Sequence, residues 1–378
     1  MKWIRLASIL LAIALVAGLI FIKILPPGPS YATEPGTSAV PSFTFTIPST
    51  TQTPVTEDPT SEPTSEPTSE PTSEPTSEPT SEPTSEPTSE PTSEPTEAPT
   101  SAPTATEAAY QMAAKNAFIY DCSTDTYLFT KGELTKKLYP ASITKLFTAY
   151  LVLQHLELSR EVTAGSILTT VPDDSSMIFL KKGDTLTVEQ LLYGTLLCSG
   201  GDAARVLAAE AGRVIAGDPN LSDSKAMDAF MAEMNTQAES LGMVNSHFVT
   251  PDGYHDKNHY SCMADLLIIG KLCLQQEQLM KIVQTVSMES PLKNKKPIWN
   301  NTNSLLLPES PFYRPEAVGM KTGYTSKAGR CLLSAFLVDG NYVLVGAFGC
   351  PDPKFTYIPH FQDTCYLFDT YIEKSQGT

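Results

Sequence analysis

The amino-acid sequence predicts a mixed α/β fold of the α+β type, in which helices and a helical subdomain flank an antiparallel sheet. A transmembrane helix and a disordered linker are expected to precede it. Three observations support this prediction. Apolar and polar residues alternate near the start of the folded part and again near its end, as in half-buried strands. The sequence between these stretches is rich in helix formers. The first 109 residues differ from both, because an apolar run is followed by Pro-rich repeats.

Residues 1–25 are predicted to form a short cytoplasmic tail and a transmembrane anchor. The stretch Leu6–Ile22 carries no charge, and Lys2 and Arg5 precede it. With the Lys23 side chain reaching toward the lipid headgroups, about 20 residues are available to span a bilayer. The positive residues favour a cytoplasmic N-terminus, which places the rest of the chain outside the membrane. A cleaved signal peptide is the alternative, although no clean small-x-small cleavage site follows the run.

Residues 26–109 are predicted to be a disordered linker. They contain no Lys, Arg or His and include nine consecutive Thr-Ser-Glu-Pro repeats, Thr60–Pro95. Proline at every fourth position forbids helix and sheet, and too little apolar surface is present to form a core. Fourteen of the 42 acidic residues of the chain lie in this linker. The remaining part is therefore only mildly acidic and has no basic stripe, so nucleic acid is not expected as a partner.

Residues 110–378 are long enough for one sizeable domain. Asn116–Asp121 and Thr126–Lys131 alternate on either side of a polar turn, which predicts a β-hairpin. Further along, Thr187-Val188-Glu189-Gln190 is a capping box ahead of a Leu-rich stretch. A second helix is expected from Asp202 to about Ile215 in Ala-rich sequence. The middle of the domain is therefore predicted to be helical.

The end of the chain returns to a strand pattern. Cys331–Val338 and Tyr342–Phe348 flank Asp339-Gly340-Asn341, which is a strong hairpin signal. The last 20 or so residues, with several aromatic side chains, are expected to form a closing helix. Strands at both ends with helices between them predict one antiparallel sheet assembled from the two ends of the domain.

The seven cysteines are scattered, and no C-x-x-C spacing occurs among them. An odd number cannot pair completely within one chain. They are interpreted as small buried hydrophobic residues, with one or two disulfides as the alternative. No metal and no cofactor are expected.

A serine and a lysine spaced as S-x-x-K, Ser142 and Lys145, are the first candidate catalytic residues. The same spacing occurs at Ser222–Lys225 and Ser290–Lys293, so the spacing alone is weak. Only Ser142 opens a stretch that is apolar almost all round, as in a buried helix, whereas the other two pairs lie in polar segments. Residues three apart share one helix face, so the Ser142 hydroxyl and the Lys145 amine are expected to meet.

Ser142 needs a base to act as a nucleophile, because a free hydroxyl is hardly ionised at neutral pH. Lys145 suits this role if burial and a second cation lower its pKa. Lys321, in the string Lys-Thr-Gly, is the candidate for that cation. A triad with one of the five histidines remains an alternative, since triads are assembled in space rather than in sequence.

The chain resembles the penicillin-binding D-alanyl-D-alanine carboxypeptidases, low-molecular-mass serine peptidases that share their fold with class A β-lactamases. The resemblance covers roughly residues 112–372. It rests on the segments around Ser142, Ser199 and Lys321, reinforced by Phe248-Val-Thr-Pro-Asp-Gly-Tyr, His259-Tyr-Ser and Asn301-Thr-Asn-Ser-Leu-Leu.

The resemblance implies a reaction and its catalytic groups. Ser142 would form an acyl-enzyme with a peptidoglycan stem peptide ending in D-Ala-D-Ala, and Lys145 would accept the proton of the serine. Ser199 would relay this proton to the departing D-alanine. β-Lactam antibiotics would act as covalent inhibitors of the same serine.

The resemblance also implies a binding strand. Lys321 and Thr322 would line it, with Thr322 holding the terminal carboxylate of the substrate. The main-chain N–H groups of Ser142 and Tyr324 would form the oxyanion hole. Gly323 would leave room for the substrate backbone.

One motif departs from the family pattern. The family usually has Ser-x-Asn in the middle of the domain, and this chain has Ser199-Gly200-Gly201. Asp202 is one position too late to supply the missing amide, so that role is not transferred to it. This departure is therefore expected to affect the catalytic rate more than the type of reaction.

Other activities of the same fold are alternatives to this interpretation. A β-lactamase of this fold would carry a glutamate within E-x-x-L-N, and no such string occurs between residues 210 and 316. A D,D-endopeptidase or transpeptidase and a catalytically weak penicillin-binding wall module remain alternatives. The domain is expected outside the cell membrane, tethered by the N-terminal helix, and the long linker suggests a thick, Gram-positive-type envelope.

Overall fold

The computed structural model describes residues 110–292, 296–352 and 358–376. The predicted transmembrane segment, residues 1–25, and the predicted linker, residues 26–109, lie outside the described residues. Within the described ranges, no helix has both the length and the apolar character needed to cross a bilayer.

The elements follow one another in the order strands, helices, strands, helix. The strands are β1 (Asn116–Asp121), β2 (Thr126–Lys131), β3 (Glu161–Thr163), β4 (Thr185–Thr187), β5 (Ser287–Glu289), β6 (Ile298–Asn300), β7 (Ala317–Thr325), β8 (Gly329–Val338) and β9 (Asn341–Cys350). The α-helices are α2 (Thr144–His155), α3 (Val188–Leu196), α4 (Gly201–Ala216), α5 (Asp223–Ser240), α6 (Met263–Leu274), α7 (Glu277–Gln284) and α8 (Pro359–Gln376). Three 3₁₀ turns complete the set: η1 (Ala141–Ile143), η2 (Ser166–Thr170) and η3 (Ser304–Leu306).

In the described part of the chain, five strands form the main antiparallel sheet in the order β2-β1-β9-β8-β7. β1 and β2 have the predicted bounds, because strict alternation and a polar turn are local signals. The turn between β8 and β9 has positive φ at Asp339 (50°) and Gly340 (79°), as the predicted hairpin requires. β1 pairs with β9 from Asn116–Phe348 to Asp121–Val343, so both ends of the domain build the sheet, as predicted.

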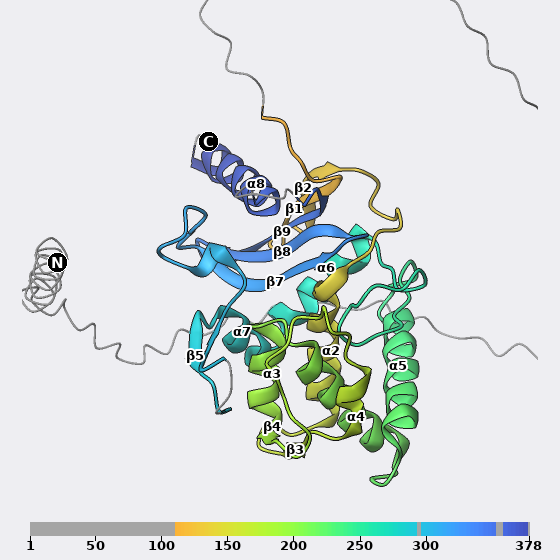
Figure 1. The fold of residues 1–378 in the computed structure, drawn as a ribbon. Helices are drawn as coiled ribbons and strands as arrows, with labels where there is room; N and C mark the ends of the chain where they lie inside the picture. The colour runs from red at the N-terminus through yellow and green to blue at the C-terminus, as the bar shows by residue number, and fades with distance from the viewer. Residues whose placement is uncertain (1–109, 293–295, 353–357, 377–378) are drawn as a thin grey trace, which may run out of the picture. The chain divides into compact units, whose positions relative to one another are not determined.

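The strands β1, β8 and β9 are buried on both faces, whereas β2 is largely exposed. Alternate residues of a strand point in opposite directions, so each of the buried strands contributes to the packing on both sides of the sheet. On β9, Val343 and Val345 face α8, whereas Leu344 faces the helices on the other side. Phe336 of β8 stacks on Phe368 of α8 with ring centroids 3.9 Å apart. Figure 1 shows α8 above the sheet and the helical part of the domain below it.

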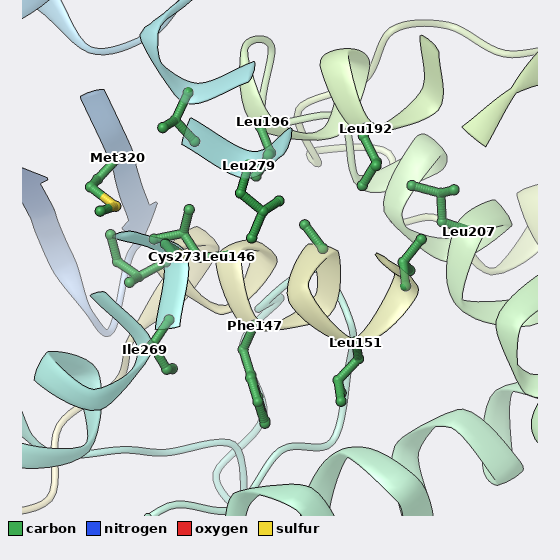
Figure 2. Close-up of a cluster of buried hydrophobic side chains, with 14 of the residues drawn as sticks. Leu146, Phe147, Leu151, Leu192, Leu196, Leu207, Ile269, Cys273, Leu279 and Met320 are labelled. Atoms are coloured by element: carbon green, nitrogen blue, oxygen red, sulfur yellow. The ribbon is translucent and has the colours of Figure 1, made fainter. Parts of the chain in front are cut away.

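The helical part is arranged around α2. α3 begins at the predicted capping box, in which Thr187 and Gln190 bond each other's main-chain N–H groups. α4 begins at Gly201, one residue before the predicted start. α2 is buried along almost its whole length, as its apolar sequence predicts. Figure 2 shows its side chains among those of neighbouring elements: Leu146, Phe147 and Leu151 from α2, then Leu192, Leu196, Leu207, Ile269, Cys273, Leu279 and Met320. All seven cysteines of the chain are buried and free.

Candidate active site

Ser142 lies on the short turn η1, which leads directly into α2. The sequence predicted that Ser142 would open the helix itself. Two glycines allow this turn to be tightly enclosed. A Cβ on Gly323 of β7 would lie 3.0 Å from the Ser142 main-chain nitrogen. Gly253, at φ +74°, would place a Cβ 1.9 Å from the carbonyl oxygen of Ala141. The turn is therefore held between β7 and the loop around Gly253, and the close neighbour of Gly323 is the Ser142 turn.

Ser142 and Lys145 meet as their spacing predicted. The Lys145 amine lies 2.9 Å from Ser142 Oγ and donates a second hydrogen bond, of 2.6 Å, to the carbonyl oxygen of Asp252. Lys145 is buried, whereas Ser142 is half-buried and lines a cavity of about 730 Å³. The hydroxyl is thus open to a ligand while the amine behind it is shielded from water.

The string Ser222–Lys225 does not form such a pair, and the string Ser290–Lys293 lies only in part within the described residues. Ser222 and Lys225 are exposed, and Ser222 is the N-cap residue of α5. Ser290 follows β5 and bonds the main chain of Leu292, while Lys293 lies outside the described residues. Of the two strings that the structure describes in full, only Ser142–Lys145 brings a hydroxyl next to a buried amine.

Burial lowers the pKa of Lys145 to about 8. The Asp252 carboxylate opposes this shift, the Arg205 guanidinium adds to it, and the Asp202 carboxylate opposes it. The Arg205 guanidinium, which was not predicted, is therefore a cation that lowers the pKa of Lys145. Burial also lowers the pKa of Lys321 well below its ordinary value, with the Lys145 ammonium as the second cause. An amine with a pKa near 8 can accept a proton near neutral pH.

Arg205 and Asp252 form a buried ion pair beside Lys145. Arg205 Nε donates to Asp252 Oδ2 at 2.9 Å, and both residues are buried. Burial disfavours the charged form of Asp252, but Lys145 and Arg205 outweigh it and hold the pKa of this carboxyl below its usual range. The charge near Lys145 is thus balanced within the site.

The strand β7 brings the predicted binding residues to the cavity. β7 is an edge strand of the sheet, so part of its main chain has no strand partner and is available to an extended ligand. The Lys321 amine donates to the Thr322 carbonyl oxygen at 2.9 Å, and Thr322 Oγ1 lies 2.7 Å from Thr302 Oγ1. Thr322, Gly323 and Tyr324 line the cavity with Ser142.

Ser199 lines the opposite part of the cavity, where it adopts a positive φ of 58°. The segment beside it is fastened by Asp202, whose carboxylate accepts the main-chain N–H groups of Ile178 and Leu180 at 3.0 Å each. Gly201 N–H also donates to Ser176 O at 2.7 Å. The Asp202 carboxylate is therefore engaged with the main chain of residues 178–180. It does not take the place of the family's asparagine, as expected from its position in the sequence.

Histidine is a poor candidate for the base. The Nδ1 atom of His259 accepts main-chain N–H groups, so its proton lies on Nε2, which donates to Thr144 Oγ1 at 2.9 Å. Burial lowers the pKa of His259 to about 4 and that of His360 to about 3. Among the described residues, which include all five histidines, no histidine hydrogen-bonds to Ser142.

Among the site residues that were not predicted are Arg205, Asp252 and Thr302, which form the hydrogen bonds and the ion pair described above. Asp252 lies in the segment Phe248–Tyr254 and Thr302 in the segment after Asn301, both of which supported the resemblance without a role being given to these side chains. The available signal for Arg205 was an arginine within the Ala-rich, apolar sequence of α4, because an arginine that is buried there needs a partner.

Comparisons with known proteins agree with this geometry. The profile of a family described as D-alanyl-D-alanine carboxypeptidase matches residues 102–346, and a profile described as a PT disordered repeat matches residues 70–108. The chain is similar to the D-alanyl-D-alanine carboxypeptidase DacF of Bacillus subtilis, with 31% identity over 64% of this chain and 58% of DacF. It is also similar to the D-alanyl-D-alanine carboxypeptidase of Streptomyces sp. strain K15, with 32% identity over 62% of this chain and 79% of the relative. The chain thus spans about three fifths of the length of DacF.

Solved structures show the same fold. The crystal structure of the Streptomyces K15 DD-transpeptidase matches with a TM-score of 0.60 and 28% identity, over 69% of this chain and 97% of that chain. The D-alanyl-D-alanine carboxypeptidase from Mycobacterium tuberculosis matches with a TM-score of 0.59 and 25% identity, over 70% and 92%. The antiparallel sheet with its flanking helices is therefore that of the D,D-peptidases.

Proposed function

The chain belongs to the D-alanyl-D-alanine carboxypeptidase family, and on this premise we propose that it is a serine-type carboxypeptidase that removes the terminal D-alanine from peptidoglycan stem peptides. The observation that carries this proposal is the pair Ser142 and Lys145. A hydroxyl on a cavity wall lies 2.9 Å from a buried amine whose pKa is lowered to about 8. These are the properties of an activated serine nucleophile and its base.

The reaction follows from this geometry in two stages. Ser142 Oγ attacks the carbonyl carbon of the penultimate D-alanine and passes its proton to Lys145 Nζ. The main-chain N–H groups of Ser142 and Tyr324 stabilise the negative oxygen that forms. The C–N bond then breaks, the departing D-alanine takes a proton from Lys145 through Ser199, and an acyl-enzyme remains on Ser142. A water molecule, deprotonated by Lys145, releases the shortened peptide and restores the serine.

Substrate binding is assigned to β7. The stem peptide lies along this edge strand as an additional antiparallel strand, using the main-chain groups that β8 leaves free. The Thr322 hydroxyl, held by Thr302 at 2.7 Å, binds the terminal carboxylate, and the Lys321 amine holds the Thr322 main chain through its hydrogen bond of 2.9 Å to the carbonyl oxygen. Carboxylate binding at this point selects peptides with a free C-terminus.

The direct test is the release of D-alanine from a peptide ending in D-Ala-D-Ala by the purified full chain. We expect one equivalent of D-alanine per peptide, together with covalent labelling by a fluorescent penicillin. The absence of both reactions would contradict the proposed activity.

Transfer to an amine acceptor is the second candidate activity, because a structure of the same fold is named a DD-transpeptidase. Adding an amino acid or a second stem peptide as acceptor separates the two. A hydrolase gives the shortened peptide only, and a transpeptidase gives a longer product at the expense of hydrolysis.

Acylation should depend on pH through Lys145. Only the neutral amine can take the serine proton, and the neutral fraction increases as pH rises through the pKa of about 8. The second-order rate constant for acylation by a penicillin is therefore expected to rise with pH and level off above this value. A flat profile, or one that falls over the same interval, would show that Lys145 does not act as the base.

The N-terminal part of the chain determines where the catalytic domain is located. We propose that residues 1–25 anchor the chain with the N-terminus in the cytoplasm, that residues 26–109 form a spacer, and that residues 110–378 work in the wall of a Gram-positive-type envelope. The apolar run and the Pro-rich repeats support this arrangement. Protease added to intact protoplasts should remove the catalytic domain, and protection of the domain would contradict the proposed orientation.

A further inference from the structure

The space next to Gly201 is filled by a group from elsewhere in the chain. A Cβ atom on Gly201 would lie 3.1 Å from Oδ2 of Asp252 and 3.4 Å from the carbonyl oxygen of Ser176. The 3.1 Å contact requires the carboxylate to give way by a few tenths of an ångström, whereas 3.4 Å is an ordinary van der Waals contact. The Asp252 carboxylate therefore lies against the position that a Cβ atom of residue 201 would take.

Asp252 connects this space to Lys145 through its main chain and its side chain. Its carbonyl oxygen accepts the Lys145 amine at 2.6 Å. Its carboxylate accepts Arg205 Nε at 2.9 Å and Arg205 Nη2 at 3.4 Å, and the main-chain N–H of Tyr254 donates to Oδ1 at 3.2 Å. The side-chain bonds fix the residue, and the fixed residue holds the amine.

We propose that the Asp252–Arg205 ion pair is a positioning element for Lys145, which holds its amine against Ser142 and balances its charge in place of a side chain from position 201. This inference rests on the proposed function, because it takes Lys145 as the base. A buried ion pair generally adds little to stability compared with apolar residues of the same size. A positioning role for Lys145 would explain why the charged residues Asp252 and Arg205 are buried at this point of the site.

The two members of the pair act on Lys145 with opposite signs. Charged or titratable groups face its amine from every neighbouring element of the described site: Asp252 and His259 from the loops before α6, Arg205 and Asp202 from α4, and Lys321 from β7. The Asp252 carboxylate raises the pKa of Lys145, and the Arg205 guanidinium lowers it. Removing one charge or the other should therefore shift the titration of Lys145 in opposite directions, which loss of packing alone would not do.

The test is the pH profile of acylation by a fluorescent penicillin, measured on the full chain. Asp252→Asn keeps the size of the side chain and removes its charge, so the midpoint of the profile should move to lower pH. Arg205→Gln should move it to higher pH. Each shift should be about one pH unit or more, the usual effect of a charge within a few ångströms. The pH midpoint of the double variant should lie between those of Asp252→Asn and the wild type. The reason is that the Asp252 carboxylate affects the pKa of Lys145 more strongly than the Arg205 guanidinium does.

A second ion pair, which joins α4 to α5, provides the control. Arg213 pairs with Asp223 away from the cavity, and Arg213→Gln and Asp223→Asn should leave the pH midpoint unchanged even if they lower the melting temperature. Gly201→Asn, which drives a side chain against the carboxylate, should slow acylation roughly tenfold or more.

Several outcomes would overturn the inference. Midpoints of the folded single variants that do not move, or that move in the same direction, would contradict it. If a single variant does not fold, the double variant still decides, because a midpoint at or above that of the wild type contradicts the proposed balance of charges. These outcomes differ from failure of the proposed function, in which the wild type itself is not labelled and releases no D-alanine.

Discussion

Replacing Ser142 by alanine is expected to abolish covalent labelling of the chain by a penicillin and release of D-alanine from a stem peptide. The label needs an oxygen nucleophile on the cavity wall, and Ser142 Oγ lies beside a base at 2.9 Å. The measurement is fluorescent labelling of the full chain followed by mapping of the labelled peptide. We expect the wild-type label on the peptide that contains Ser142 and no label on Ser142→Ala.

The matched control is Ser222→Ala, which changes a serine of the same S-x-x-K spacing. Ser222 is exposed, and its side chain makes no capping hydrogen bond in the described part of α5. Labelling of Ser222→Ala should therefore equal that of the wild type. Label on Ser142→Ala, at Ser222, Ser290 or Ser199, would mean that the nucleophile has been wrongly assigned.

Replacing Lys145 by alanine is expected to slow acylation by about 10²-fold or more, the usual contribution of a general base. The variant keeps the nucleophile but removes the amine that takes its proton. It also leaves the Asp252 carbonyl oxygen without its donor, so folding must be checked by circular dichroism. The measurement is the second-order rate constant for labelling at a pH above the pKa of Lys145.

Lys225→Ala is the control for this variant, because Lys225 is the exposed lysine of the second S-x-x-K string. It should label at the wild-type rate. If folded Lys145→Ala also labelled at nearly the wild-type rate, the base would have to be another group on the cavity, and His255 and His360 would be the residues to change next.

Local signals in the sequence were sufficient for the strands and helices that frame the site. The first hairpin was predicted to the residue, since alternation and turn chemistry act over a few positions. The capping box of α3 is similarly local. The 3₁₀ turn that carries Ser142 could not be predicted in this way, because its shape depends on Gly253 and Gly323, which come from distant parts of the chain.

The chemistry of the site was predictable only in part. The pairing of Ser142 with Lys145 followed from their spacing, whereas Arg205, a cation that lowers the pKa of Lys145, was not predicted. Arg205 and Asp252 are 47 residues apart, and nothing in either local sequence indicates that they meet. Long-range ion pairs of this kind depend on how α4 and the loop before α6 pack together, which no local pattern encodes.

The pairing of β1 with β9 has a consequence for the order in which the domain is made. β1 is synthesised before all the helices of the described chain, whereas its partner β9, which occupies the middle of the sheet, is synthesised after β7 and β8. Until then the β1–β2 hairpin has an open edge, which is a site for mispairing with other chains. The edge strand β7 that encloses Ser142 is likewise made late. A growing chain that lacks β7, β8 and β9 therefore has neither the complete five-stranded sheet nor an enclosed Ser142, and both form when these strands are in place.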